Sequence, residues 1–274
     1  MSWSERQALM LQAMGLRLWV PAASAEASEL ETRPQPGAAA LAREPVAAVV
    51  PPAARPVAVH VVEPDAVTLP AVQPLPATDT AGMDWPALRD AVAACRSCGL
   101  CETRTQTVFG AGNPQAHWLI VGEAPGAEED RRGEPFVGAS GQLLDAMLLS
   151  LGLSRLADSS DPARSVYIAN ALKCRPPSNR NPQPREMLQC APFLQRQIEL
   201  LQPRVIVAMG RFAAQALLRN ETPLGQLRGQ VHRVGQCPVV VTYHPSYLLR
   251  SPGEKAKAWA DLCLAAMTVD SRGP

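Results

Sequence analysis

Four short apolar runs, separated by segments of helical length, limit the fold of this chain more than any other feature. The runs contain few polar residues, which is typical of strands buried on both faces of a sheet. Strands that alternate with helices form a parallel sheet with helices on both sides. We therefore predict a three-layer α/β/α domain around a central, mainly parallel four-stranded sheet. The strands are expected at residues 117–122, 165–170, 204–210 and 238–242, and the helices at residues 84–94, 141–151, 185–201, 211–218 and 255–267.

Glycine or polar residues follow each expected strand. In open α/β sheets, ligands bind outside the carboxyl ends of the strands, where the loops meet at one edge. The residues at these ends are Gly122, Asn170, Gly210 and His244. The turn that starts at Gly122, Gly-Glu-Ala-Pro-Gly, permits close approach of the backbone to a ligand, but it lacks the Gly-Lys-Ser/Thr of a phosphate-binding loop. We therefore expect a ligand site at this edge.

The candidate side chains at this edge each have an ordinary structural interpretation as well. Phe136 suits core packing, the commoner role of a phenylalanine, or stacking on a ligand. Asn170 suits capping of the next segment, or hydrogen bonding to a nucleobase, because its amide offers a donor beside an acceptor. His244, directly before a proline, is either structural or part of the site.

A second group of candidates follows that histidine. Leu248 and Leu249 precede Arg250 in a segment that we expect to be a loop. The pattern suits an apolar wedge beside a phosphate contact, or a hydrophobic anchor for the loop.

Four cysteines have the spacing of one metal centre. Cys95 and Cys98 form a close pair, and Cys174 and Cys190 follow as distant single residues. Four thiolates from separate parts of a fold bind a tetrahedral zinc ion or a polynuclear iron–sulfur centre. Cys101 extends the close pair into a run that imitates a ferredoxin motif. The spacing alone leaves the identity of the metal open.

The amino-terminal region differs in composition from the rest. Residues 22–80 contain ten prolines and no aromatic residue, so they lack the material for a core. We predict a short amphipathic segment at residues 1–21, a disordered Pro/Ala-rich linker at residues 22–82 and a folded domain at residues 83–274. The predicted domain contains 21 basic and 17 acidic residues. This mildly basic balance permits a polyanionic partner.

The seven cysteines do not form the disulfide framework of a small secreted protein. The apolar run at residues 10–21 is interrupted by Gln12, Gly15 and Arg17, which argues against a signal peptide. No stretch approaches the roughly 20 apolar residues that cross a bilayer. We therefore expect a cytoplasmic protein that does not contact a membrane.

Five motifs together resemble the family 4 (iron–sulfur) uracil-DNA glycosylases. They are GEAPG, GEPFVGASGQLLD, N-x2-KCRPP-x-NR, IVAMG and HPSYLLR, in the family's order over roughly residues 90–265. The resemblance implies a 4Fe–4S cluster on Cys95, Cys98, Cys174 and Cys190, with Cys101 as a spare cysteine. It also implies that the substrate is uracil-containing DNA, single- or double-stranded, and that uracil is released as the N-glycosidic bond is hydrolysed.

The resemblance further assigns roles at the sheet edge. Asn170 is expected to bind the uracil edge and exclude cytosine, and Phe136 to stack on the base. His244 is expected to donate to uracil O2 as negative charge develops there. Leu248 is expected to fill the gap in the base stack, and Arg250 to hold a neighbouring phosphate.

The residue that activates water is the family role with the least direct match in this sequence. Other branches of the superfamily place an aspartate where this chain has Ala124, so Glu123 is the candidate for positioning water. Gly122, Ala124 and Glu129 are further expected to contact the substrate. The acidic residues at 128–130 also suit a solvated turn. Without the aspartate, catalysis is expected to depend more on the leaving group than on a general base.

An alternative to the enzyme is a non-catalytic iron–sulfur or zinc protein that binds nucleic acid beside the replication machinery. Residues 11–19 loosely resemble the start of the psi subunit of the bacterial clamp-loader complex, so a replisome contact through residues 1–21 is a further hypothesis. The joint presence of Asn170, Phe136 and His244 favours the enzyme, because binding alone does not require all three. A monomer is expected.

Overall fold

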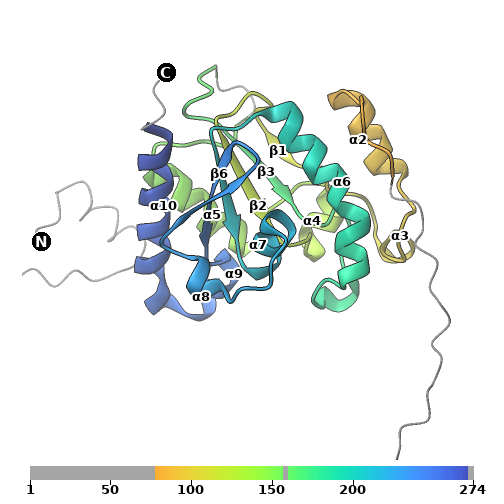
Figure 1. Ribbon diagram of the computed structural model, residues 1–274. Coiled ribbons are helices and arrows are strands. Elements are labelled where there is room, and N and C mark those ends of the chain that lie inside the picture. Colours follow the sequence, from red (N-terminus) through yellow and green to blue (C-terminus); the bar gives the residue numbers. More distant parts are fainter. Residues whose placement is uncertain (1–77, 157–159, 271–274) are drawn as a thin grey trace, which may run out of the picture. The chain divides into compact units, whose positions relative to one another are not determined.

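The structure, a computed structural model, describes residues 78–156 and 160–270 (Figure 1). Its centre is a six-stranded sheet in the order β1-β3-β2-β4-β6-β5. The predicted three-layer α/β fold is confirmed, and all four predicted strands are present and parallel to one another. These four are β2 (Trp118–Gly122), β3 (Val166–Asn170), β4 (Val205–Met209) and β6 (Cys237–Thr242).

Two edge strands extend the predicted four-stranded sheet to six. β1 (Ala111–Gly112) pairs antiparallel with β3, and β5 (Val231–Val234) pairs antiparallel with β6. β1 is only two residues long, which is too short for a periodic signal. β5 alternates exposed and half-buried residues instead of forming an apolar run, as an edge strand with one solvated face does. Both strands were therefore outside the sequence prediction.

Helices cover both faces of the sheet, and the five predicted ones are all present within a few residues of their expected ends. The structure adds four short helices of four to six residues and two 3-10 turns. Segments of one or two turns are too short to show helical periodicity. The predicted helices are α2 (Trp85–Ala94), α5 (Ala139–Ser150), α6 (Pro184–Leu201), α7 (Arg211–Leu218) and α10 (Lys255–Asp270). The additional elements are α3 (Leu100–Thr103), α4 (Ala127–Arg132), η1 (Pro177–Asn179), α8 (Leu224–Leu227), α9 (Pro245–Arg250) and η2 (Pro252–Glu254).

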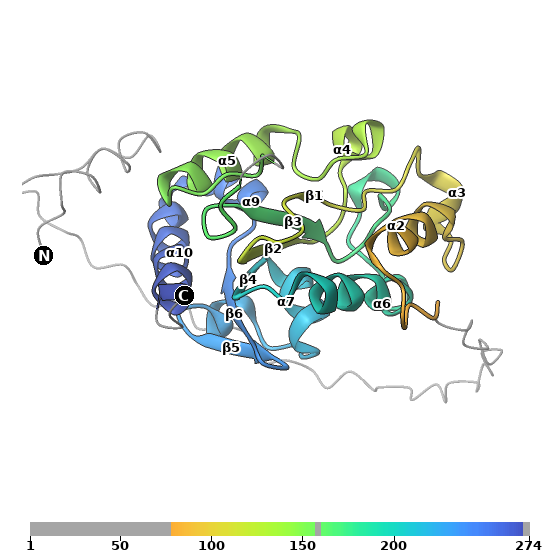
Figure 2. The same ribbon diagram turned by 90° about the horizontal axis from the view of Figure 1, so that it is seen from above.

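Alternate residues of each strand face opposite sides of the sheet and form two separate cores. Ile120, Ile168 and Val207 belong to the core shared with α5, α9 and α10. Leu119, Tyr167 and Ile206 belong to the core shared with α6 and α7. Figure 2 shows α5 and α6 on opposite sides of the sheet. The long apolar runs follow from this arrangement, because both faces of each central strand are buried.

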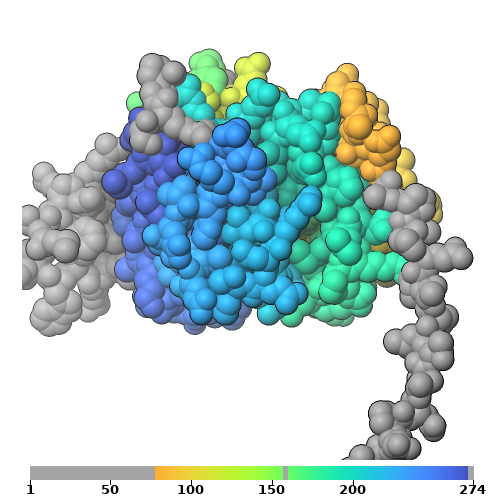
Figure 3. Space-filling view, in the orientation of Figure 1, coloured from red at the N-terminus to blue at the C-terminus, as the bar shows by residue number. Residues whose placement is uncertain are grey.

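A third, smaller core joins α2 to α6, which lie side by side although about 90 residues separate them in the chain (Figures 1 and 3). The hydroxyl of Thr80, which is 9% exposed, donates to the carbonyl of Pro192 on α6 at 3.3 Å. Thr80, which we assigned to the linker, therefore contacts α6. Residues 22–77 of the predicted linker and the amphipathic segment at 1–21 lie outside the described residues.

None of the helices in the described ranges has the length and apolar content that crossing a bilayer requires.

The close approach of α5 to the preceding loop depends on Gly141. A Cβ at this position would lie 1.8 Å from the carbonyl oxygen of Phe136. We expect Gly141→Ala to lower the free energy of unfolding by about 1–3 kcal/mol or more, because one of the two backbones must move. Thermal and urea unfolding measure this change.

Gly225→Ala is the matched control, because Gly225 lies in α8 with no atom within 4 Å of the added methyl. Equal stability of the two variants would show that the loop before α5 accommodates the methyl group freely.

Candidate active site

A pocket of about 830 Å³ lies at the carboxyl ends of the four parallel strands. One residue from each strand end lines it: Glu123 after β2, Asn170 at the end of β3, Arg211 after β4 and His244 after β6. The structure therefore brings the predicted residues together at the predicted edge. Ala124, Glu129, Phe136 and Arg250 line the same pocket.

Asn170 and Phe136 meet over Gly122. In the parallel register, Gly122 of β2 is paired with Asn170 of β3. A Cβ on Gly122 would lie 2.4 Å from Asn170 Oδ1 and 2.7 Å from the Phe136 ring. Only a glycine fits here, so its absent side chain lets an amide and an aromatic ring share one corner of the pocket.

Phe136 is held in an unusual backbone conformation. Its φ is 55°, in the left-handed region that bulky residues rarely adopt. The guanidinium of Arg155 donates to the carbonyls of Pro135 and Phe136, both at 3.0 Å, and pairs with Asp145 at 2.6 Å. The ring of Phe136 is 5% exposed within the core and also forms a wall of the pocket. The core and ligand-wall interpretations are therefore compatible.

His244 presents a defined tautomer to the pocket. It caps α9, and the backbone N–H of Ser246 donates to its Nδ1 at 3.1 Å. Because Nδ1 is an acceptor, the ring proton lies on Nε2 in the neutral imidazole. Burial, assisted by the charge of Arg250, lowers the pKa of His244 to about 4. The ring stacks on Phe136 with centroids 5.4 Å apart, so amide, aromatic ring and imidazole form one group.

Glu123 is a half-buried carboxyl group in the pocket wall. Burial raises its pKa, and the positive charge of Arg211 partly opposes this rise. Its backbone carbonyl accepts a hydrogen bond from Leu172 N–H at 3.0 Å, which fixes the loop while leaving the side chain free to face the pocket.

Glu129 connects two loops of the pocket. One carboxylate oxygen accepts from Gly126 N–H at 3.1 Å, and the other accepts from Val137 and Gly138 at 3.0 and 3.2 Å. Its neighbour Asp130, also buried, accepts from Thr105 N–H. The solvated-turn interpretation therefore applies only to residue 128, which is exposed.

The segment after His244 is helix α9, so the expected loop is wrong. Leu248 is fully buried in the core beside α5, where a wedge into DNA is not available to it. The exposed apolar side chains of α9 are Tyr247, 38% exposed, and Leu249, 45% exposed. In a helix that begins with His244 as its cap, Leu248 lies three residues after Pro245 on the same face, and both are buried there.

Sequence reasoning missed several residues that line the pocket. Arg211 and Tyr243 directly flank strand-end residues that we had identified, so their position was a usable signal. Arg180 lay within a quoted motif without a role, and its guanidinium forms an ion pair with the buried Glu186. Ser140 and Tyr247 likewise lay within quoted motifs without a role.

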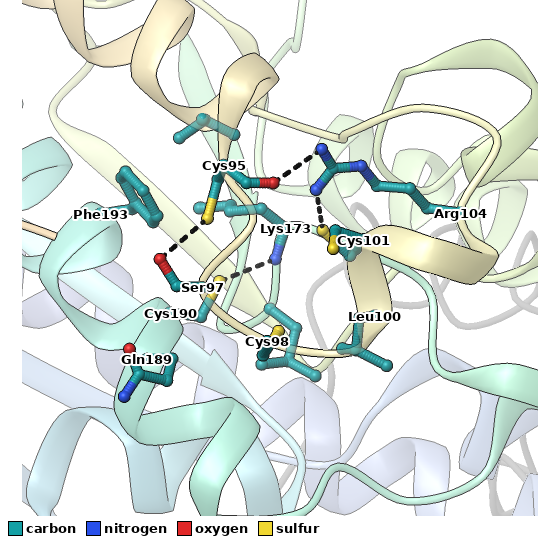
Figure 4. A pocket seen from close by; sticks show the side chains of 13 residues that line it. Cys95, Ser97, Cys98, Leu100, Cys101, Arg104, Lys173, Gln189, Cys190 and Phe193 are labelled. Carbon is teal, nitrogen blue, oxygen red and sulfur yellow. Dashed lines mark hydrogen bonds between the residues drawn. The ribbon is translucent and has the colours of Figure 1, made fainter. Parts of the chain in front are cut away.

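All four predicted metal ligands line a second cavity, shown in Figure 4. Cys95 and Cys98 follow α2, Cys174 follows β3, and Cys190 lies in α6. Cys101 lines the same cavity. Among the described residues, no group of three His, Cys, Asp or Glu side chains is arranged to hold a single metal ion.

Hydrogen-bond donors reach two of these sulfur atoms. Arg104 donates to Cys174 Sγ at 2.9 Å. It also donates to the Cys95 carbonyl at 2.9 Å (Figure 4). The backbone N–H of Lys173 donates to Cys190 Sγ at 3.2 Å. Burial raises the pKa of the Cys190 thiol to about 12 and raises those of Cys98 and Cys174. In this apolar cavity the thiolate forms need a cationic partner.

Lys173 links the cysteine cavity to the pocket. Its side chain is 1% exposed, and Nζ donates to the Asn170 carbonyl at 2.9 Å, to Gln197 Oε1 at 2.6 Å and to the Phe109 carbonyl at 3.4 Å. Burial lowers its pKa to about 8, against the opposing effect of nearby sulfurs. The end of β3 is therefore fixed from the side of the cysteines.

Comparison with known proteins agrees with this site. The sequence model of the uracil DNA glycosylase superfamily matches residues 109–266. The type-4 uracil-DNA glycosylase of Archaeoglobus fulgidus is 44% identical over 169 residues, covering 59% of this chain and 81% of the relative. That of Pyrobaculum aerophilum is 40% identical over 190 residues, covering 66% and 93%. That of Thermotoga maritima is 42% identical over 162 residues, covering 58% and 80%.

The chain thus belongs to the uracil DNA glycosylase superfamily and, within it, to the type-4 uracil-DNA glycosylases. The resemblance inferred from five motifs is confirmed.

The three hydrogen bonds to Glu129 generate a prediction. Glu129→Gln keeps the shape but has one acceptor oxygen, and its NH2 group would face a backbone donor. We expect the free energy of unfolding to fall by about 1.5–3 kcal/mol, the usual contribution of hydrogen bonds to a charged group. Chemical denaturation measures this change.

Glu128→Gln is the neighbouring control, because Glu128 is exposed and its ion pairs within the described residues are with Arg131 and Arg132. Its effect should be much smaller. Equal effects in the two variants would mean that the connection between the loops adds little stability.

Proposed function

We propose that this chain hydrolyses the N-glycosidic bond of deoxyuridine in DNA, releasing free uracil and leaving an abasic site. The main support for this proposal is that Asn170, Phe136 and the Nε2 side of His244 meet in one pocket at the sheet edge. A base within a duplex cannot reach such a pocket, so the nucleotide is extruded or the strand is already single. This is the first step of base excision repair.

Recognition of the base rests on Asn170 and Phe136. Asn170 is 2% exposed and lies at a strand end, so its side-chain amide has little freedom to move. Uracil presents a complementary acceptor and donor, whereas cytosine places an amino donor against the amide donor. Stacking on the Phe136 ring adds roughly 1–3 kcal/mol for such contacts.

Departure of the base rests on His244. As the bond breaks, negative charge develops on the uracil, and a donor in place before the reaction stabilises it. The Nε2 proton fits this role, because Nδ1 is occupied by the N–H of Ser246. With a pKa lowered to about 4, the imidazole is neutral at physiological pH and donates without carrying a full charge.

Positioning of water rests on Glu123. It is the carboxylate of the pocket wall whose oxygens accept no hydrogen bond in the described structure, whereas those of Glu129 are occupied. Ala124 leaves the adjacent position without a carboxylate. Stabilisation of the leaving base therefore contributes more to the rate than activation of water by a general base.

On the DNA side, Arg250 holds a phosphate. Because Leu248 is buried, we assign the filling of the gap in the base stack to the exposed Leu249.

We further propose that Cys95, Cys98, Cys174 and Cys190 hold a 4Fe–4S cluster. The donor set fits, because sulfurs from three separate segments line one cavity and two of them receive N–H donors. Lys173 forms no ion pair with a carboxylate among the described residues, and thiolates beside it would balance its buried charge. When bound, the cluster would crosslink α2 to the β3–α6 segment. Iron and sulfide analysis distinguishes it from zinc.

We propose a cytoplasmic location, where thiols stay reduced and able to bind metal, and action as a monomer. The contact of residues 1–21 with a clamp-loader subunit stays a hypothesis about residues outside the described structure.

Release of free uracil from a labelled single-stranded oligonucleotide tests the function. The wild-type protein should release uracil, and Asn170→Asp should lose rate and selectivity over cytosine, because a carboxylate oxygen replaces the amide donor. Absence of uracil release by a folded wild-type protein that binds DNA would favour the non-catalytic alternative.

The two candidate catalytic residues, His244 and Glu123, should contribute unequally to the excision rate. We expect His244→Ala to lower the excision rate by roughly 100-fold or more, as removal of a donor to a developing anion does. Glu123→Ala should lower the rate by less. Single-turnover rates measure both, with circular dichroism as the folding control. A comparable or larger loss in folded Glu123→Ala would reverse the order.

A further inference from the structure

Arg211 is an exposed cation of the pocket wall to which neither the sequence motifs nor the family resemblance gives a role. It follows β4, directly after Gly210. A Cβ on Gly210 would lie 3.2 Å from the Cβ of His244. Arg211 therefore starts from backbone that packs against the imidazole side of the pocket.

Arg211 interacts electrostatically with Glu123 but is not held in a direct ion pair among the described residues. Within the described part of the chain it forms no ion pair, and its guanidinium carbon lies 4.4 Å from the centre of the Phe212 ring. Arg250 likewise forms no ion pair there, whereas Arg180 is paired with Glu186. Two unpaired guanidinium groups thus line one pocket.

The pocket defines where a phosphate would lie. A uracil held by Asn170, Phe136 and His244 occupies the buried corner, so the sugar and its two phosphates lie toward the exposed rim. Arg211 and Arg250 are both exposed and come from different elements: Arg211 begins α7 after β4, and Arg250 ends α9, which follows β6. An arginine offers a planar pair of donors that matches a phosphate.

We propose that Arg211 is a second DNA-backbone contact, which binds one phosphate beside the extruded nucleotide while Arg250 binds another. This inference rests on the proposed function for the position of the base. The contact is independent of base sequence, so it contributes to affinity for any strand.

The test measures binding without chemistry. A labelled single-stranded oligonucleotide with thymine in place of uracil is titrated against the full chain by fluorescence anisotropy at several salt concentrations. For Arg211→Gln we expect several-fold weaker binding and a salt slope that is smaller by about 0.7, the value for one phosphate contact on a single strand. Arg211→Lys keeps the charge and should restore the slope.

Arg233→Gln is the matched control, because Arg233 is exposed on β5 and does not line the pocket. It should leave affinity and slope unchanged. An unchanged slope in Arg211→Gln overturns the proposal, and so does an equal loss in the control. The excision rate of Arg211→Gln as a function of pH distinguishes another role. If only the acid limb of this profile moves to higher pH and binding is unchanged, Arg211 acts by keeping Glu123 ionised, and the phosphate contact is excluded.

A negative result for the Arg211 contact can be distinguished from a negative result for the proposed glycosylase activity. Uracil release by the wild type is measured separately, and it would stand even if Arg211 did not contact DNA.

Discussion

The in-register parallel pairing of β2 with β3 and β4 is the constraint on which the rest of this structure depends. It places Gly122 opposite Asn170 and aligns the ends of three strands, so that their following residues surround one volume. Because side chains alternate along a strand, a shift by one residue would direct Asn170 to the opposite face of the sheet. The apolar residues of both faces oppose such a shift, since it would expose one core and bury polar groups in the other. The stability of the sheet and the geometry of the pocket therefore have the same origin.

Much of the supporting structure consists of charged groups that bond backbone atoms. Glu129 holds the turn after β2 to the loop before α5, Arg155 holds the strained Phe136, and Lys173 holds the end of β3. Each group is buried or half-buried and uses several hydrogen bonds, so its desolvation is offset by contacts that also fix a loop. The loops and the strand end that carry the pocket side chains are therefore held in place by these groups.

The sequence predicted the parts of the fold that repeat a pattern. The apolar runs and amphipathic helices were sufficient for the three layers and for the edge at which Asn170 and His244 meet. Motif resemblance added the roles. The two-residue β1, the one-sided β5 and the short α9 lack a periodic signal, so they were missed, and Leu248 was assigned to the wrong environment. The bonding of Glu129 and Lys173 joins residues whose proximity depends on the completed fold, which local spacing does not encode.

The segment from Cys174 to Cys190 has both ends at the cysteine cavity, and between them it contributes Pro176, Asn179, Arg180 and Asn181 to the pocket wall. Two successive residues in it, Ser178 and Asn179, have positive φ values of 54° and 53°. Backbone strain of this kind persists where the surrounding structure restrains the chain, and the two anchored ends are part of that restraint. Oxidative damage to the thiols would therefore deform the nucleotide pocket first, while the sheet beneath it stays folded. The state of the thiols and the shape of the pocket wall are thus linked through this one segment.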